Sequence, residues 1–137
     1  MMKKATRDEK NENGAAAPMH LGGIGTTAGT IDIPKTAIVC ADAELIGPHS
    51  IHIGDDCVLH PTARIEAITG NIVLGAGNVL EEQVVIRNDY HPSLFHHEAG
   101  RFSSKTMTIG SGNLFEVRSE LHNVPELGDR NLFMLEC

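Results

Sequence analysis

Large aromatic residues are scarce in this chain, which has no tryptophan, one tyrosine and four phenylalanines among 137 residues. The scarcity excludes a core built around aromatic anchors. The hydrophobic residues, 41% of the chain, are mainly aliphatic. Long apolar runs are also missing, and none approaches the roughly 20 residues that a membrane-spanning helix needs. We therefore expect an aliphatic core and no membrane span.

Positive charge is in short supply as well, with 11 lysines and arginines against 18 acidic residues and a net charge of −7. Nucleic acid is therefore not expected as a partner, because phosphate binding needs a basic surface. The three cysteines, Cys40, Cys57 and Cys137, are odd in number and lack metal-ligand spacing. Cys40 and Cys57 lie in apolar stretches, where a reduced thiol acts as a small hydrophobe. A cytoplasmic protein is the simplest interpretation.

What the chain does contain is an aliphatic or aromatic residue at every sixth position, a period that fits neither a helix nor a single strand. The expected core residues are Ile33, Val39, Leu45, Ile53, Leu59, Ile65, Leu74, Leu80, Ile86, Ile109, Phe115, Leu121, Leu127 and Phe133. The step lengthens by two residues before Ile53, by three before Leu74 and by seventeen before Ile109. No polar residue interrupts this series.

A glycine follows the first core residue of four groups. These coil-turn glycines are Gly54, Gly75, Gly110 and Gly128. Because glycine tolerates positive φ, the pattern predicts a turn that recurs at one corner of each eighteen-residue unit. Small side chains that would fit a narrow corner precede many core residues by two positions: Ala37, Ala43, Cys57, Ala63 and Ser119.

Three hexapeptides per turn, each with one inward side chain, predict an all-β fold, a parallel β-helix of triangular cross-section. We expect a left-handed parallel β-helix, because the known proteins with this hexapeptide repeat coil in the left-handed sense. About four to five coils would stack to roughly 20–24 Å. A β-sandwich whose strands happen to repeat at six is the alternative.

Two regions fall outside the period. Residues 1–30 are first charged and then rich in Gly, Ala and Thr, so we expect a disordered N-terminal tail, with a weak extra coil through Leu21 and Ile24 as the alternative. Residues 31–137 form the expected β-helix, interrupted by a loop insertion at 87–108. The insertion carries His91, His96 and His97, but nothing completes a metal site, and packing against the coils or a partner is favoured.

With the repeat indexed, the chain resembles the dynactin subunit 6 family of hexapeptide-repeat proteins. The segments that carry the resemblance are AIVCADAEL (37–45), VLHPTARIEA (58–67), GNIVLGAGNVLEEQVVI (70–86), TIGSGNLFEV (108–117) and LGDRNLF (127–133). The sequence ends four residues after Phe133, with the fifth coil only partly indexed. We therefore expect either a C-terminally shortened form of the family or an end that something else caps.

The resemblance implies a non-catalytic scaffold, not an enzyme. It implies a structural subunit of the dynactin pointed-end complex, associated with the cytoskeleton, that supports dynein cargo engagement and microtubule-based transport. The implied partners are other dynactin subunits, especially the related β-helical subunit (dynactin subunit 5) and the pointed-end actin-related protein. If that pairing holds, Glu81, Glu82 and Glu116 lie on a partner face; solvated acidic positions are the alternative.

Two enzyme classes of similar repeat provide the alternatives. The γ-class carbonic anhydrases hold zinc with three histidines, whose positions fall here on Arg87, Val117 and His122. Zinc catalysis needs three protein ligands, and only His122 qualifies, so we expect a surface residue or remnant there. Hexapeptide acyltransferases use one histidine as general base, and His91 has no identifiable carboxylate to orient it. We expect no catalytic residue, metal or cofactor.

Overall fold

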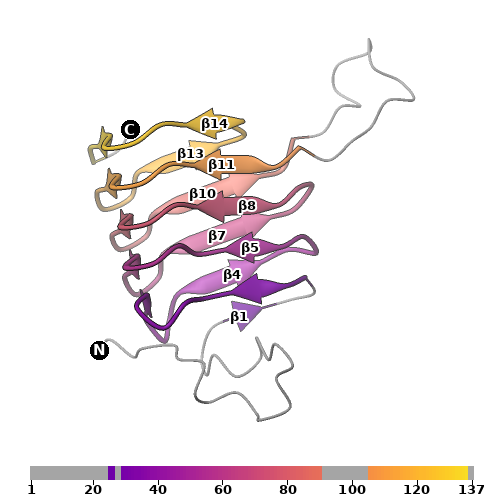
Figure 1. The fold of residues 1–137 in the computed structure, drawn as a ribbon, viewed down its shortest axis with the longest axis horizontal. Helices are drawn as coiled ribbons and strands as arrows, with labels where there is room; N and C mark the ends of the chain where they lie inside the picture. Colours follow the sequence, from indigo (N-terminus) through magenta and orange to yellow (C-terminus); the bar gives the residue numbers. More distant parts are fainter. Residues whose placement is uncertain (1–24, 27–28, 91–104, 136–137) are drawn as a thin grey trace.

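Short parallel strands follow one another along the chain and wind into a β-solenoid (Figure 1). The structure is a computed structural model that describes residues 25–26, 29–90 and 105–135. Its strands form three parallel sheets of five strands each, called sheets A, B and C below. Each complete coil contributes one strand to sheet B, then one to sheet C, then one to sheet A.

The strands are two to four residues long. Sheet A contains, in spatial order, β1 (Gly25–Thr26), β4 (Glu44–Ile46), β7 (Arg64–Ala67), β10 (Val85–Asn88) and β13 (Glu120–His122). Sheet B contains β2 (Ile31–Asp32), β5 (Ile51–His52), β8 (Ile72–Leu74), β11 (Met107–Ile109) and β14 (Glu126–Leu127). Sheet C contains β3 (Ile38–Val39), β6 (Val58–Leu59), β9 (Val79–Leu80), β12 (Leu114–Phe115) and β15 (Leu132–Phe133).

The pairing of strands between coils follows the hexapeptide index. Ile31 lies beside Ile51, Ile51 beside Ile72, and Ile72 beside Met107. The extra residues that lengthen three of the steps therefore all leave the solenoid at the corner between sheets A and B. Insertions at one corner keep every inward side chain in phase, because a slip of one residue would turn a strand's core residue outward.

The inward side chains form one continuous aliphatic core. All the indexed residues except Leu127 and Phe133 are buried, and these two pack against the core while partly exposed. The rings of Phe115 and Phe133 stack in parallel planes, 4.6 Å apart between centroids. The small residues two positions earlier are fully buried at the corners.

The turn glycines serve a different purpose from the one expected. Positive φ occurs two positions later, at Asp56, Gly77, Gly112 and Arg130. What the glycines provide is close approach between coils. A Cβ on Gly54 would lie 2.3 Å from the carbonyl oxygen of Gly75, and a Cβ on Gly110 would lie 2.7 Å from the carbonyl oxygen of Gly128. Gly128 itself has no neighbour within 4 Å.

Two expected boundaries shift. The insertion predicted at 87–108 is shorter in the structure, because β10 continues to Asn88 and β11 begins at Met107, where backbone pairing with neighbouring coils extends each strand. Within the expected tail, β1 pairs with β4. Leu21, Ile24 and the loop histidines lie outside the described residues, and the division into tail and β-helix remains a prediction.

The expected all-β parallel β-helix is confirmed, while its left-handed sense remains an expectation from the resemblance. The described ranges contain no helix, so none there is long and apolar enough to cross a membrane.

Candidate interaction faces

The three positions that correspond to zinc ligands carry an arginine, a valine and one histidine. β10 places Arg87 directly beside His122 of β13. The Nε of Arg87 donates instead to Oε1 of Glu66 at 2.6 Å, and Nε2 of His122 lies 3.1 Å from Oε1 of Glu120. Val117 lies past the end of β12, where its amide donates to Oε1 of Glu81. A cationic side chain beside the single imidazole would repel a metal ion. No group of three or more metal-binding side chains occurs in the part of the chain that the structure describes.

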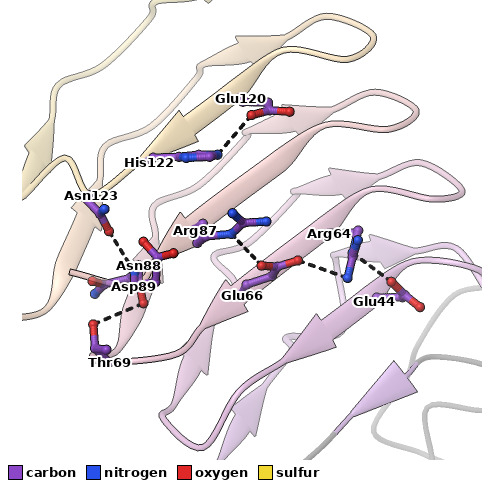
Figure 2. A network of polar contacts seen from close by, with 10 residues as sticks. All are labelled: Glu44, Arg64, Glu66, Thr69, Arg87, Asn88, Asp89, Glu120, His122 and Asn123. Carbon is purple, nitrogen blue, oxygen red and sulfur yellow. Dashed lines mark hydrogen bonds and ion pairs between the residues drawn. The ribbon is translucent and has the colours of Figure 1, made fainter. Parts of the chain in front are cut away.

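Arg87 belongs to a network of charges on the outer surface of sheet A (Figure 2). Glu66 is its centre, because one carboxylate oxygen accepts from Arg87 and the other lies 3.1 Å from Nη2 of Arg64. Nε of Arg64 lies 2.9 Å from Oε1 of Glu44, one coil further. The two arginines cover Glu66 so completely that only 6% of it is exposed. The hydrogen bond to Glu66 raises the pKa of Arg87 above its ordinary value.

The network joins three neighbouring strands across consecutive coils. Its charges are balanced, so it exposes little net charge, and each half-exposed arginine is held by a carboxylate. Such an arrangement ties the coils together but does not present a free nucleophile or a free base. Chemically, it can hold the sheet and offer a rigid polar surface.

Asn88 fixes the base of the insertion. Asn88 is buried, although the residue before it, Arg87, points outward. The Nδ2 of Asn88 donates to the carbonyl oxygens of Asn71 and Lys105 at 3.1 and 2.8 Å. Alongside it, the amide of Asp89 donates to Oδ1 of Asn123 at 2.7 Å, as Figure 2 shows. The two ends of the insertion are therefore held together. The sequence analysis did not single out Asn88. The one sign of its role in the sequence is that it is a polar residue two positions after the core residue Ile86.

The three glutamates predicted for a partner face lie at the corner between sheets C and A. Glu81 and Glu116 occupy equivalent positions in consecutive coils, since the Glu81 amide donates to the carbonyl oxygen of Phe115, the residue before Glu116. The Glu116 carboxylate accepts from the amide of Leu135 at 3.2 Å. Glu82 is exposed, and its Oε2 lies 3.5 Å from Nδ1 of His60. Two of the three thus cap backbone amides of the next coil while remaining half-exposed.

Neither described cysteine is a candidate nucleophile. Cys40 and Cys57 are buried and reduced. Burial raises the pKa of both thiols, so less thiolate forms at neutral pH than in an exposed cysteine. The thiol of Cys57 donates to the carbonyl oxygen of Gly75 at 3.0 Å, a structural contact at the corner between sheets B and C.

Taken together, a parallel solenoid of hexapeptide repeats, with paired charges on one face and no assembled ligand set among its described residues, defines a hexapeptide-repeat β-helix protein. No family model matches the chain. It is, however, 38% identical to dynactin subunit 6 of Xenopus tropicalis over 104 residues, which is 76% of this chain and 49% of that relative.

Dynactin subunit 6 of Danio rerio is 36% identical over 75% of this chain and 51% of its own length. The protein of the same name from Caenorhabditis elegans is 33% identical over 78% of this chain and 51% of its own length. The resemblance to dynactin subunit 6 is therefore confirmed over three quarters of the chain. The chain spans about half the length of the curated relatives it matches.

Proposed function

We propose that this chain belongs to the dynactin subunit 6 family and acts as a non-catalytic structural subunit of dynactin. The observation that carries the proposal is the similarity to dynactin subunit 6 over three quarters of the chain. The geometry is compatible with it, because stacked coils tied by backbone pairing make a rigid prism with broad faces.

The enzyme alternatives find less support. Carbonic anhydrase chemistry needs three protein ligands on zinc, and Arg87, paired with Glu66, occupies one of the three positions. An acyltransferase needs an oriented general base. His60 and His122 each lie near a single exposed glutamate, which gives neither a closed site nor a fixed orientation.

The finer part of the proposal places the chain in the pointed-end complex, in the cytoplasm with the cytoskeleton, where it supports dynein cargo engagement and microtubule-based transport. Its partners there are the related β-helical subunit and the pointed-end actin-related protein. The corner of Glu81, Glu82 and Glu116 contributes to one partner face. Its support is the grouping of these carboxylates, with Glu82 exposed beside His60 where an incoming basic side chain can reach it.

The test is affinity purification of the tagged chain from an extract of its own cells, followed by mass spectrometry. We expect dynactin subunits, with the β-helical and actin-related subunits most enriched. Glu82→Lys should reduce their recovery, because it reverses an exposed charge on the partner face. Glu126→Lys is the matched control, since Glu126 is also exposed but lies on sheet B.

Recovery of the chain only with itself, as a trimer, would overturn the structural role and favour an enzyme. Zinc that survives dialysis and is lost in His122→Ala would do the same. Equal loss of dynactin subunits in both glutamate variants would remove the assignment of the partner face while leaving the subunit role in place.

A further inference from the structure

Sheet C carries an uninterrupted aliphatic stripe on its outer surface. One outward residue of each strand lies in register with the next, from the first coil to the fifth. The stripe consists of Ile38, Val58, Val79, Leu114 and Leu132. The first four are half-buried and Leu132 is 55% exposed.

The other two faces differ at the corresponding register. Sheet B presents Asp32, His52, Val73, Thr108 and Glu126. Sheet A presents Glu44, Arg64, Val85 and Glu120. Strand propensity alone would favour branched residues on all three sheets. Because only sheet C excludes polar residues from this column, its stripe is typical of a surface that another molecule covers.

The flanks of the stripe indicate the charge of that molecule. Over the five coils of the stripe, one flank carries Lys35, Asp55, Asp56, Asp129 and Arg130, and the other carries Asp42, the glutamate corner of Glu81, Glu82 and Glu116, and Arg118. Carboxylates therefore outnumber lysine and arginine by three to two on the first flank and by four to one on the second. Because both flanks carry a net negative charge, a second copy of the chain docked face to face would meet net repulsion, so charge disfavours self-association through sheet C.

The spacing of the stripe indicates the shape of the occupant. Neighbouring strands are about 4.8 Å apart, so the five residues span roughly 19 Å along the solenoid axis. The seam of an amphipathic helix has an apolar residue every 3.5 residues on average, or about 5.2 Å along its axis. About four turns of helix laid along the solenoid would therefore meet the stripe nearly residue for residue.

We propose that the outer face of sheet C binds an amphipathic α-helix of a partner protein, one whose aliphatic seam is flanked on both sides by lysine and arginine. The seam packs on the aliphatic stripe. The basic side chains extend along the helix surface to the carboxylates on either flank. This inference stands on the face itself and does not depend on the assignment to dynactin.

The test uses the 137-residue chain and a synthetic, labelled helical peptide of about 18 residues, long enough to cover the stripe at 1.5 Å per residue. The peptide has leucine along its seam and lysine and arginine on its flanks. Fluorescence anisotropy should show saturable binding that weakens as salt rises from about 0.05 to 0.3 M, since the flanking contacts are screened. The same peptide with glutamate on its flanks should not bind.

One coil supplies matched variants. Val73, Val79 and Val85 are outward, half-buried valines of the same coil, one on each face. Val79→Lys should reduce affinity by at least about tenfold, because it places an unpaired charge in an apolar contact. Val73→Lys and Val85→Lys should change the affinity by less than about twofold, because both residues lie outside the contact. If Val79→Lys disturbs the circular dichroism spectrum, Val79→Thr serves in its place.

Three results would overturn the proposal. The first is absence of saturable binding to the unmodified chain, and the second is equal loss of affinity in the three valine variants. The third is a dimer of the chain in sedimentation that Val79→Lys dissolves, which would assign the stripe to a second copy.

Discussion

Replacing Asn113 with alanine removes the middle rung of a ladder of three asparagines that crosses consecutive coils. The Asn113 side chain donates from Nδ2 to Oδ1 of Asn78 and to the carbonyl oxygen of Gly128, both at 3.0 Å. Its Oδ1 accepts from the amide and from Nδ2 of Asn131, at 2.7 and 3.0 Å. Only 1% of Asn113 is exposed, so the side chain itself is closed to water.

The loss of folding stability in Asn113→Ala depends on which polar groups are left without a hydrogen bond. Asn78 stays paired, because the backbone amide of residue 113 still donates to its Oδ1 and its Nδ2 still donates to the carbonyl oxygens of Gly75 and Gly110. The carbonyl oxygen of Gly128 and the amide of Asn131 lose their hydrogen bonds, and a stranded buried group costs about 1–3 kcal/mol. Gly128 and Asn131 are themselves exposed, so water recovers part of this. We expect Asn113→Ala to lower the free energy of unfolding by about 2–3 kcal/mol.

Asn131→Ala is the matched control, since it removes the exposed last rung and should cost only about 0.5–1 kcal/mol. Urea unfolding followed by circular dichroism measures both. Equal losses for the two variants, or a loss below about 1 kcal/mol for Asn113→Ala, would refute the reasoning that burial of the middle rung makes its bonds expensive to lose.

Asn113→Asp tests whether the destabilisation grows or shrinks as the pH rises. One carboxylate oxygen would keep the two donors of Asn131, but the other would face two acceptor oxygens, on Asn78 and Gly128. We expect this repulsion, together with burial, to outweigh the two donors and to raise the pKa in the folded state above the unfolded value of about 3.9. A raised acid pKa destabilises the fold only where the group is ionised in the unfolded state. The deficit relative to the unmodified chain should therefore be small below about pH 4 and grow as the pH rises toward neutrality.

Three further substitutions or measurements test separate parts of the structure. Gln83 is exposed and has a φ of 64°, so Gln83→Gly should stabilise the chain by about 0.5–1 kcal/mol, whereas Glu82→Gly, with no positive φ to relieve, should destabilise it. Glu66→Gln should cost about 1–2 kcal/mol in the same assay, because it leaves two arginines beside a neutral group; an unchanged free energy would show that the network is only a surface ion pair. Finally, Cys40 and Cys57 should react slowly with a thiol reagent in the folded chain and quickly in urea, as peptide mapping can show, because burial raises their pKa.

Much of the fold was predictable because a solenoid repeats one physical requirement. Every coil needs an inward aliphatic residue per side, so the period of six reports the core directly, and register between coils follows once the extra residues are located. The reason assigned to the turn glycines was wrong, however. Close approach between coils and positive φ both favour glycine, and the sequence alone does not separate them, whereas the structure places positive φ at Asp56 and Arg130, which are not glycines.

The polar features were harder to predict because they depend on neighbours in other coils. Glu66 becomes a buried centre only when Arg64 and Arg87 are brought over it, and Arg87 lies 21 residues away. The asparagine ladder did leave a signal, since Asn78, Asn113 and Asn131 all lie two positions before a core residue. That offset indicates a small residue at a corner, but not that its amide bonds to the next coil.

In this molecule the inward and corner side chains stabilise the fold, whereas the outward side chains are available for binding. The core and the asparagine ladder lie inside or at a corner, and they bond one coil to the next whatever the outer faces carry. The outer register is consequently free to vary. The three valines of one coil lie beside polar residues on sheet B, charged residues on sheet A and aliphatic residues on sheet C. Mutations should divide along the same line. Asn113→Ala should weaken folding in proportion to lost hydrogen bonds, while Val79→Lys should leave the urea midpoint nearly unchanged and abolish helix binding. A variant that did both equally would show that sheet C contributes its outer surface to the fold itself, and the stripe would then be structural rather than a binding face.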